Sequence, residues 1–572
     1  MAKLAEERII ARLRDGAFWQ KVRSSPEYGP LVDEIRARYG ECRFGGDIPV
    51  LKFSIRTRFE RDGDRREFES PYFRRRVSLS YTALLSLIEP ENPVLTEELQ
   101  DLIWAVTEES CWVLPAHLKF AEAGDSSYID LFAAETGFAL AEISAALGDR
   151  LDEKVRLRVR ELVKERILDP FKEHPMNWEV TTNNWAAVCA GNVGGALIYL
   201  FPEEFPALLP RLLGAMKSFL RGYSDEGICY EGLDYWNYGF GNFTWFAELL
   251  DRFTDGSADG RIDLMADPKA EACAGFGQRA FLKGGCVVSF SDTSRSGSVD
   301  LALQNFLARR YPGTVRKLPA SVACPWGGNT PWMNMLRNLL FFEPPAPEAS
   351  EEEPVSFFLP AAGQAIVNRR RYSLAVKAGN NDECEGHNDV GTFILSTEKG
   401  QIFCDLGSGT YNRDYFDESK RYGIFCVGSR GHSVPIVNGA YQKHGKEYCG
   451  TIRQTGQNGQ TVDRLELELS GAYGIPGVSR LNRTFSTEED RITLTDSFEP
   501  DYESITERFI TLIKPAADGN RVKVGDAVLE YDPEQARLDI HAEEDTGGVG
   551  TVWCVDFLLK PGLDRVSFTF LI

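Results

Sequence analysis

The segment Phe341-Phe-Glu-Pro-Pro-Ala-Pro-Glu-Ala-Ser-Glu-Glu-Glu-Pro354 divides this sequence into two parts with different hydrophobic periods. Proline and acidic residues dominate the segment, and this composition is typical of a linker. Before it, apolar residues recur at helical spacing. After it, they alternate with polar residues, as in strands. We therefore predict a multidomain α+β protein, with a helical domain at residues 1–345 and an antiparallel β-sandwich region at residues 355–572.

Both halves carry local patterns that support this division. Leu140, Ile143 and Leu147 share one face of a predicted helix, and loops rich in Gly, Pro and Asn separate such stripes at intervals typical of stacked helical hairpins. In the second half, Leu465 and Leu467 alternate with charged residues, which is the pattern of a half-buried strand. Helices that precede strands in this way favour segregated domains over an alternating α/β sheet.

The charge of the chain limits its partners. The formal net charge of the 572 residues is -21, and such a field repels nucleic acid and anionic membrane surfaces. No window is expected to span a membrane. We therefore predict no nucleic-acid partner and no membrane partner. The sequence leaves the oligomeric state open and allows a homo-oligomer.

The cysteines and the N-terminal region bear on the compartment. The twelve cysteines show no framework spacing, and several lie among apolar residues, so we interpret them as reduced thiols. The first residues form a charged amphipathic pattern without a continuous apolar signal core. We therefore expect a cytoplasmic protein, whose substrates of extracellular origin would arrive as imported oligomers.

Two polar and aromatic motifs in the helical part predict a binding pocket. The first is Thr181-Thr-Asn183-Asn184-Trp185, and the second is Asp225-Glu-Gly-Ile-Cys-Tyr-Glu231-Gly-Leu-Asp234-Tyr235-Trp236-Asn-Tyr238-Gly239. Such side chains stack on sugar rings and bond to hydroxyl groups. Alternatively, the asparagines cap a helix and the aromatic side chains pack against a neighbouring helix.

A histidine cluster in the sheet region predicts a metal site. His387 lies in Glu385-Gly-His387-Asn-Asp389, Asp405 follows at a predicted hairpin, and His432 lies in Gly431-His-Ser-Val-Pro. Two imidazoles and a carboxylate are a ligand set that zinc accepts. Alternatively, these are a turn histidine and a core histidine bonded to backbone. We expect Asp389 to satisfy backbone groups in a turn.

Taken in order, these motifs resemble the heparinase II/III group of polysaccharide lyases, which is related to the oligo-alginate lyases. The resemblance extends over residues 100–440 by motif. It implies an (α/α) toroid followed by antiparallel β-sandwich domains, with the active site in the cleft between them. It also implies β-elimination at a uronate in an anionic oligosaccharide, in place of hydrolysis.

The resemblance also implies roles for single residues. Asn184 matches the residue that holds the uronate carboxylate, and Tyr235 best matches the base or acid, with Tyr238 as the alternative. A structural Zn²⁺ at His387, Asp405 and His432 is implied as well. Two departures stand out, because Glu385 and Trp185 replace histidines that many members carry. Glu385 could therefore share the proton transfer, since a carboxyl group beside an apolar wall can keep a raised pKa.

The proposed chemistry explains why these residue types are needed. The C5 proton of a uronate is weakly acidic while its carboxylate stays charged, so a hydrogen-bond donor such as an amide must stabilise the developing enolate. A phenol can then take that proton and return one to the leaving O4 atom. We expect cleavage from a chain end of an imported oligosaccharide.

The remaining candidates are substrate-binding residues. They are Asn183, Trp185, Glu231 and Trp236 from the two motifs, His117, and the cationic Arg421 and Arg430. Guanidinium groups suit carboxylates, although a solvated charged loop explains Arg421 and Arg430 equally well. Alternatively, His117 has a structural role and does not bind the substrate.

Two other functions fit the same residues. One is a glycoside hydrolase of toroidal fold, which would use paired carboxylates from Glu226, Glu231 and Asp234. The other is a non-catalytic glycan-binding protein, which the two replaced histidines favour.

Overall fold

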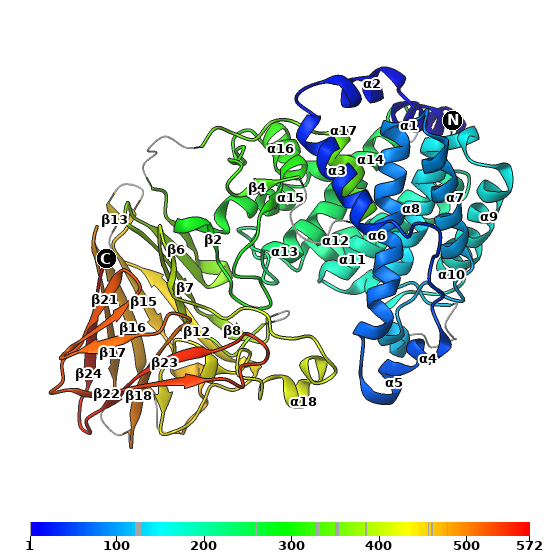
Figure 1. Cartoon of the computed structure of the whole chain (residues 1–572). Coiled ribbons are helices and arrows are strands. Elements are labelled where there is room, and N and C mark those ends of the chain that lie inside the picture. The colour runs from blue at the N-terminus through cyan, green and yellow to red at the C-terminus, as the bar shows by residue number, and fades with distance from the viewer. Residues whose placement is uncertain are drawn as a thin grey trace.

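The computed structural model describes residues 2–120, 127–257, 260–325, 331–348, 354–383, 386–455, 457–458, 461–476, 479–499 and 502–572. Figure 1 shows two lobes, with helices gathered in one and strands in the other, and with the two termini in different lobes. The last long helix, α17, ends at Leu340, and the first strand of the sheet lobe, β5, begins at Phe357.

In the helical lobe, helices that follow one another in the chain run antiparallel. Its helices are α1 (Ala2–Leu13), α2 (Gly16–Ser24), α3 (Gly29–Cys42), α4 (Phe53–Arg56), α5 (Arg58–Asp62), α6 (Arg66–Ile88), α7 (Pro93–Thr107), α8 (Leu131–Leu147), α9 (Glu153–Val163), α10 (Asp169–Glu173), α11 (Asn184–Leu200), α12 (Phe205–Leu220), α13 (Leu233–Tyr235), α14 (Gly241–Thr254), α15 (Pro268–Ala274), α16 (Leu301–Arg310) and α17 (Trp332–Leu340).

Helix α11 lies at the centre of this lobe, where it contacts α8, α12 and α14. Its glycines make this packing feasible, because a Cβ atom at Gly194 would overlap the ring of Phe246 and one at Gly195 the ring of Phe138. Asn183 caps the helix by accepting a hydrogen bond from the Trp185 amide at 3.2 Å. The N-terminus of α11 therefore has a fixed position.

Helix α8 corrects one expectation. With the turn that follows it, residues Leu131–Arg150 are long and apolar enough to cross a membrane by length and composition. In the described part of the chain, however, 89% of that window is buried among other helices. The helix is apolar all round because it packs in the core of the lobe.

Antiparallel sheets form the second lobe. Within the described ranges, the largest sheet has nine strands in the order β19-β20-β21-β24-β17-β16-β15-β12-β8. Their bounds are β19 Ala516–Asp518, β20 Arg521–Val524, β21 Ala527–Glu530, β24 Arg565–Leu571, β17 Arg491–Phe498, β16 Leu481–Thr487, β15 Arg464–Glu468, β12 Gly445–Gln454 and β8 Gly379–Asn381.

Two smaller sheets pack against the large one. The first has the order β10-β9-β7-β6-β5 and the second β11-β18-β23-β22. Their bounds are β10 Gly400–Phe403, β9 Phe393–Thr397, β7 Tyr372–Lys377, β6 Gln364–Asn368, β5 Phe357–Leu359, β11 Ile436–Val437, β18 Ile505–Thr511, β23 Val552–Leu559 and β22 Ala536–Glu543. Phe393 of β9 lies 5.5 Å from Phe485 of β16, and Phe509 of β18 lies 5.1 Å from Phe568 of β24, measured between ring centroids. The predicted sandwich is confirmed.

The two lobes are joined by more than the linker. A segment of the helical half, with short strands β1 (Phe281–Leu282) and β2 (Cys286–Val287), lies against the sheet lobe. Leu282 and Phe290 pack with Ile366 and Ile394 of the five-stranded sheet. This contact fixes the position of the residues that follow Phe290.

Candidate functional site

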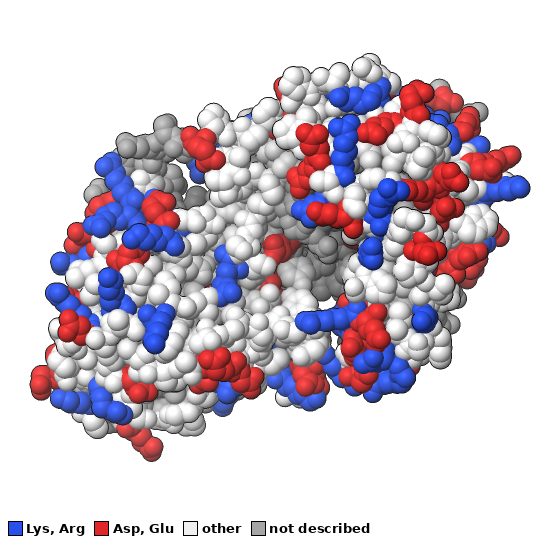
Figure 2. Space-filling model, in the orientation of Figure 1, with Lys and Arg blue, Asp and Glu red and all other residues white. Residues whose placement is uncertain are grey.

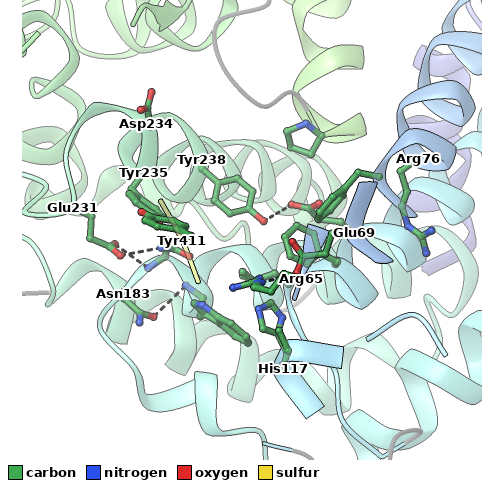
Figure 3. Close-up of a pocket in the computed structure, with 18 of the residues that line it drawn as sticks. Arg65, Glu69, Arg76, His117, Asn183, Glu231, Asp234, Tyr235, Tyr238 and Tyr411 are labelled. Carbon is green, nitrogen blue, oxygen red and sulfur yellow. Dashed lines mark hydrogen bonds and ion pairs between the residues drawn. The ribbon is translucent and has the colours of Figure 1, made fainter. Parts of the chain in front are cut away.

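A cleft with a volume of about 1530 Å³ lies between the two lobes. Its walls come from the N-termini of α6, α8 and α11, from α13 and the turn after it, and from the sheet-lobe loop that contains Tyr411, Arg413 and Phe416. Figure 3 shows 18 of the residues that line it. Tyr, Trp, Phe and Asn dominate the surface around a few charged groups, as in carbohydrate sites.

Asn184 lies at the N-terminus of α11, where Glu231 fixes its amide. The Nδ2 atom of Asn184 donates to Glu231 Oε1 at 3.0 Å, and its backbone amide donates to Glu231 Oε2 at 3.3 Å. The Oδ1 atom is buried and has no hydrogen-bond partner among the described residues. Because the second Nδ2 hydrogen is not needed by Glu231, this amide can bind a substrate group as donor and as acceptor.

Tyr235 and Tyr238 lie on one short helical segment, whose second half packs against α11. Tyr235 ends α13, and a π-helical turn, Trp236–Phe240, follows. A Cβ atom at Gly239 would lie 3.1 Å from the Asn184 Cβ atom, so this glycine allows the turn to pack on the start of α11. Both phenols line the cleft, as Figure 3 shows.

The Tyr235 hydroxyl begins a hydrogen-bonded chain that crosses between the lobes. It lies 3.2 Å from the hydroxyl of Tyr411, which in turn donates to Asp292 Oδ2 at 3.3 Å. Since the Tyr411 proton is directed to Asp292, Tyr235 is the donor in the first bond. Asp292 then reaches His387, whose Nε2 lies 3.0 Å from Asp292 Oδ1.

Asp292 is a buried hub that the sequence did not reveal. Besides Tyr411 and His387, it accepts hydrogen bonds from Tyr415 and, at 3.1 Å, from Arg421 Nη2. Burial raises the pKa of Asp292, but the hydrogen bond and charge of His387, together with the charge of Arg421, outweigh burial and lower the pKa below its ordinary value. Asp292 is therefore a permanent anion that orients the groups around it.

The predicted metal ligands come together in the core of the sheet lobe. His387, Asp405 and His432 are fully buried, and one possible ligand atom from each lies within 4.8 Å of the others. His432 Nδ1 lies 2.9 Å from Asp405 Oδ2. His387 Nδ1 and His432 Nε2 are buried without a hydrogen-bond partner in the described structure. Two such imidazole nitrogens fit a metal ion, which satisfies them by coordination.

Asp389 has a different partner from the one expected. Its Oδ1 atom accepts a hydrogen bond from Lys377 Nζ at 2.8 Å, and both side chains are fully buried. Burial lowers the pKa of Lys377, but Asp389 and Glu383 outweigh burial and raise it. The expectation that Asp389 satisfies backbone groups is thus corrected, because a buried ammonium needs a carboxylate partner.

The far wall of the cleft holds a second pair of polar groups. Tyr238 donates to Glu135 Oε1 at 2.5 Å. Burial raises the pKa of Glu135 to about 7, against the lowering effect of this hydrogen bond. His117 also lines the cleft, with Nδ1 2.7 Å from Asp130 Oδ2 and its ring 4.9 Å from that of Trp185.

The structure places three predicted substrate-binding residues outside the cleft lining. Trp236 points into the helical core, where Nε1 donates to the Cys273 carbonyl at 2.9 Å. Arg421 is buried on Asp292, and Arg430 is exposed and donates to the Gly423 carbonyl at 2.9 Å. The predictions that Trp236, Arg421 and Arg430 bind the substrate are therefore corrected. A core indole and a guanidinium bound to Asp292 cannot face the ligand. Glu385 lies outside the described residues.

The structure brings the other candidates together, and it adds some that sequence reasoning missed. Asn183, Asn184, Trp185, Glu231, Tyr235, Tyr238 and His117 all line the cleft. The missed residues are Glu135 and Asp292. Tyr411 and Arg413 belong to the loop of interleaved tyrosines and arginines from which Arg421 and Arg430 were chosen as candidates, and the structure places Tyr411 and Arg413 in the cleft lining instead. Glu135 lies within an ordinary apolar helix pattern, and Asp292 carries no local signal.

A comparison with protein families finds a match in the sheet lobe. Residues 352–548 match a family model described as Heparinase II/III-like, C-terminal. No curated protein matches the chain by sequence.

Solved structures match over nearly the whole chain. A heparan sulfate lyase, HepC from Pedobacter heparinus, has 12% identity and a TM-score of 0.59, over 99% of this chain and 88% of that one. A heparinase III has 12% identity and a TM-score of 0.59, over 94% and 84%. A chondroitin AC lyase from Streptomyces coelicolor A3, solved in complex with chondroitin sulphate, has 12% identity and a TM-score of 0.54, over 99% and 82%. These structures confirm the predicted toroid and sandwich architecture, and the family model confirms the resemblance to the heparinase II/III group over residues 352–548.

Proposed function

We propose that this protein is a polysaccharide lyase that cleaves a uronate-containing oligosaccharide by β-elimination in the cleft between its lobes. One observation carries the proposal. Asn184 and Tyr235 line the same cleft, and the Tyr235 hydroxyl is held by Tyr411 from the other lobe at 3.2 Å. An amide and an oriented phenol on one wall of an aromatic cleft are what the elimination of a carbon-bound proton requires.

Asn184 binds the uronate carboxylate in this account. Its second Nδ2 hydrogen donates to one carboxylate oxygen, while Glu231 holds the amide in a single orientation. As the C5 proton leaves, charge develops on the carboxylate oxygens, and the hydrogen bond strengthens. A neutral donor that is already oriented stabilises this charge without reorganisation.

Tyr235 exchanges protons with the sugar. Its oxygen takes the C5 proton as its own proton passes to O4, the C4–O4 bond breaks, and a C4–C5 double bond forms. The phenol is neutral before and after the reaction, so no lasting phenolate is required. Tyr411, held by Asp292, keeps the hydroxyl in place between turnovers. Glu385 stays a proposed contributor to this proton exchange.

The same geometry argues against Glu226 and Glu231 as a pair of hydrolytic carboxylates. Both oxygens of Glu231 accept hydrogen bonds from Asn184, and Glu226 Oε1 accepts one from the Ala361 amide at 2.8 Å. Glu226 does not line the cleft as described. A hydrolase would need a free acid on one side of the glycosidic bond and a base on the other.

The sheet-lobe loop closes one side of the cleft, which supports cleavage from a chain end. Arg413 donates to the Phe59 and Glu60 carbonyl groups of α5, and its guanidinium lies 5.5 Å from the Phe59 ring. Nearby, Arg65 of the helical lobe lies 5.8 Å from the Phe416 ring. A long polymer could pass this bridge only if the contacts opened, whereas a short chain end can enter.

We also propose that His387, Asp405 and His432 bind a structural Zn²⁺. Imidazole and carboxylate groups are ligands that zinc accepts. The two buried imidazole nitrogens that have no hydrogen-bond partner among the described residues are available to coordinate the ion. A bound zinc ion would supply positive charge and hold His387 in place. His387 in turn orients Asp292 and, through it, Tyr411.

The described cysteines are free thiols, which supports the proposed cytoplasmic location.

A panel of oligosaccharides tests the function. The protein is incubated with heparan, chondroitin, alginate and pectic oligomers while ultraviolet absorbance is followed for new C4–C5 double bonds. We expect absorbance to rise with at least one uronate oligomer. If none of them gives the signal although they bind, the protein is a glycan-binding protein and the proposal is wrong.

A further inference from the structure

Residues 289–293, here called the strap, connect the two lobes at the wall of the cleft. They follow the segment that packs on the five-stranded sheet, and Ser294, directly after them, lines the cleft. Figure 2 shows the hollow between the lobes. Within the strap, Asp292 accepts a hydrogen bond from Tyr411, and its neighbour Thr293 contacts the helical lobe. The strap therefore reaches both walls of the cleft.

The backbone of the strap has a conformation that few side chains adopt. Ser291 has a φ of 62° although it is not a glycine, and its side chain is buried. Such a left-handed conformation costs free energy and persists only where the surroundings impose it. Ser289 Oγ donates to the Asp405 carbonyl at 3.2 Å, and side chains of the sheet lobe converge on Asp292. The sheet lobe therefore fixes the strap from one side.

Thr293 is clamped between two glycines, one from each lobe. A Cβ atom at Gly232 would lie 1.4 Å from Thr293 Oγ1, and one at Gly407 would lie 2.1 Å from the Thr293 carbonyl oxygen. Both glycines also have positive φ angles, of 89° and 65°. A side chain at either glycine would displace the threonine. The spacing between the strap and these two loops is therefore fixed.

The hydroxyl group of Thr293 reaches the residue that holds Asn184. Its Oγ1 atom donates to the Glu231 backbone carbonyl at 3.2 Å, and the Thr293 side chain is fully buried. Glu231 in turn accepts hydrogen bonds from Asn184 Nδ2 at 3.0 Å and from the Asn184 backbone amide at 3.3 Å. Because Asp292 holds Tyr411 from the preceding position, one segment holds the partners of both the amide and the phenol.

We propose, on the basis of the lyase function above, that Thr293 is a positioning residue for the elimination. Its hydroxyl group fixes the Glu231 backbone, and with it the carboxylate that orients the Asn184 amide toward the substrate. An amide displaced by about 1 Å from the developing negative charge loses most of its effect on the rate. Since Asp292 and Thr293 are adjacent, the strap sets the positions of the amide and the phenol relative to each other.

Hydrogen exchange tests this positioning without any substrate. Thr293→Val has nearly the same shape but lacks the hydroxyl group, so the acceptor of the Asn184 amide is held less firmly. We expect amide exchange at the start of α11, measured by mass spectrometry on peptides of the full chain, to become at least about tenfold faster. Thr293→Ser keeps the hydroxyl group and should exchange like wild type. Unchanged exchange in Thr293→Val, or equal acceleration in both variants, would overturn the inference.

Thr511→Val is the matched control. Thr511 is also fully buried, and its hydroxyl group donates to a backbone carbonyl, that of Ile402 at 2.7 Å. It lies in β18, outside the described cleft lining. This variant should leave exchange at the start of α11 unchanged, whatever its effect on Tm. If exchange there became faster in Thr511→Val as well, general loss of stability would explain the result and Thr293 would have no specific role.

Kinetics separate the positioning from the lyase function itself. With the uronate oligomer that gives the strongest ultraviolet signal, we expect Thr293→Val to lower kcat about tenfold or more, because the displaced amide loses charge stabilisation. KM should change by less than about threefold, and Thr293→Ser should keep the kcat of wild type. A raised KM with an unchanged kcat would contradict the inference. If wild type forms no double bonds with any oligomer, the lyase function fails, whereas the exchange measurement still decides whether Thr293 holds Asn184.

Discussion

Tyr235 and Tyr238 face the same cleft, but they have different partners. The Tyr235 hydroxyl forms a hydrogen bond with the Tyr411 hydroxyl, whereas Tyr238 donates a hydrogen bond to Glu135. Burial and the neighbouring Glu135 raise the pKa of Tyr238 well above its usual value, so this phenol gives up its proton with difficulty. The two side chains can therefore be assigned different roles.

Substitution should separate these two tyrosines. We predict that Tyr235→Phe lowers kcat about 100- to 10,000-fold, as expected for the loss of a positioned acid and base. Tyr238→Phe should lower it by less than about tenfold, because it removes only a donor to Glu135. Initial rates of double-bond formation measure both variants. The reverse order of effects would assign the proton transfer to Tyr238.

Glu135 should make stability depend on pH. Its pKa is about 7 in the folded protein, against an ordinary value of 4.5. Between these values the unfolded chain ionises while the folded one does not, so the stability it contributes is lost as pH rises from about 4.5 to 7. Glu135→Gln should thus be more stable than wild type by about 1–2 kcal/mol at pH 8, with little difference at pH 4.

Thermal unfolding at several pH values checks this prediction. Glu91→Gln, at an exposed position on the surface, is a suitable control whose difference from wild type should stay constant over the same range. A Glu135→Gln variant that gains no stability between pH 4 and pH 8 would contradict the assignment of a raised pKa.

The sequence predicted some of these residues and missed others for physical reasons. Asn184 and Tyr235 lie in dense polar and aromatic motifs, which a core does not need, so they could be found. Asp292 contacts His387 across 95 positions in the chain, and no local pattern encodes such a contact. Trp236 was misplaced because the π-helical turn directs it inward while its two neighbouring tyrosines face the cleft.

At the scale of elements, the sheet-lobe loop with Arg413 bridges the cleft to α5. We predict that Arg413→Ala opens this bridge and shifts cleavage from chain ends toward internal bonds. Time courses of product size on a long oligosaccharide measure the shift, with larger early products in the variant. Arg430→Ala is the control, because this exposed arginine binds the Gly423 carbonyl outside the cleft lining. Identical product sizes in the two variants would rule out the bridge as the cause of end-cleavage.

The elements themselves were the most predictable level. The alternation of Leu465 and Leu467 lies in β15, where the sequence pattern put a strand, because one face of this strand is buried. The segment from Phe281 to Asp300 was not predicted. Its short strands lack periodicity, and its position depends on contacts with the sheet lobe.

For the molecule as a whole, zinc should hold the sheet lobe together. We predict that the purified protein contains bound zinc, and that chelation or His432→Ala lowers Tm by at least about 3 °C, because the metal binds the folded state. His541→Ala is the control, since this partly exposed histidine lies 3.2 Å from Asp539, far along the chain from the cluster. Metal analysis and thermal unfolding provide the readouts. Equal Tm values for the two variants, with no zinc present, would exclude the metal.

The reaction type can be tested in one measurement. The protein is given its preferred uronate oligosaccharide in water enriched in the heavy oxygen isotope, and the products are weighed by mass spectrometry. We predict products whose masses sum to that of the substrate, with no heavy oxygen incorporated and a double bond in one product. Products that have gained a heavy water molecule would show hydrolysis and contradict elimination by Asn184 and Tyr235.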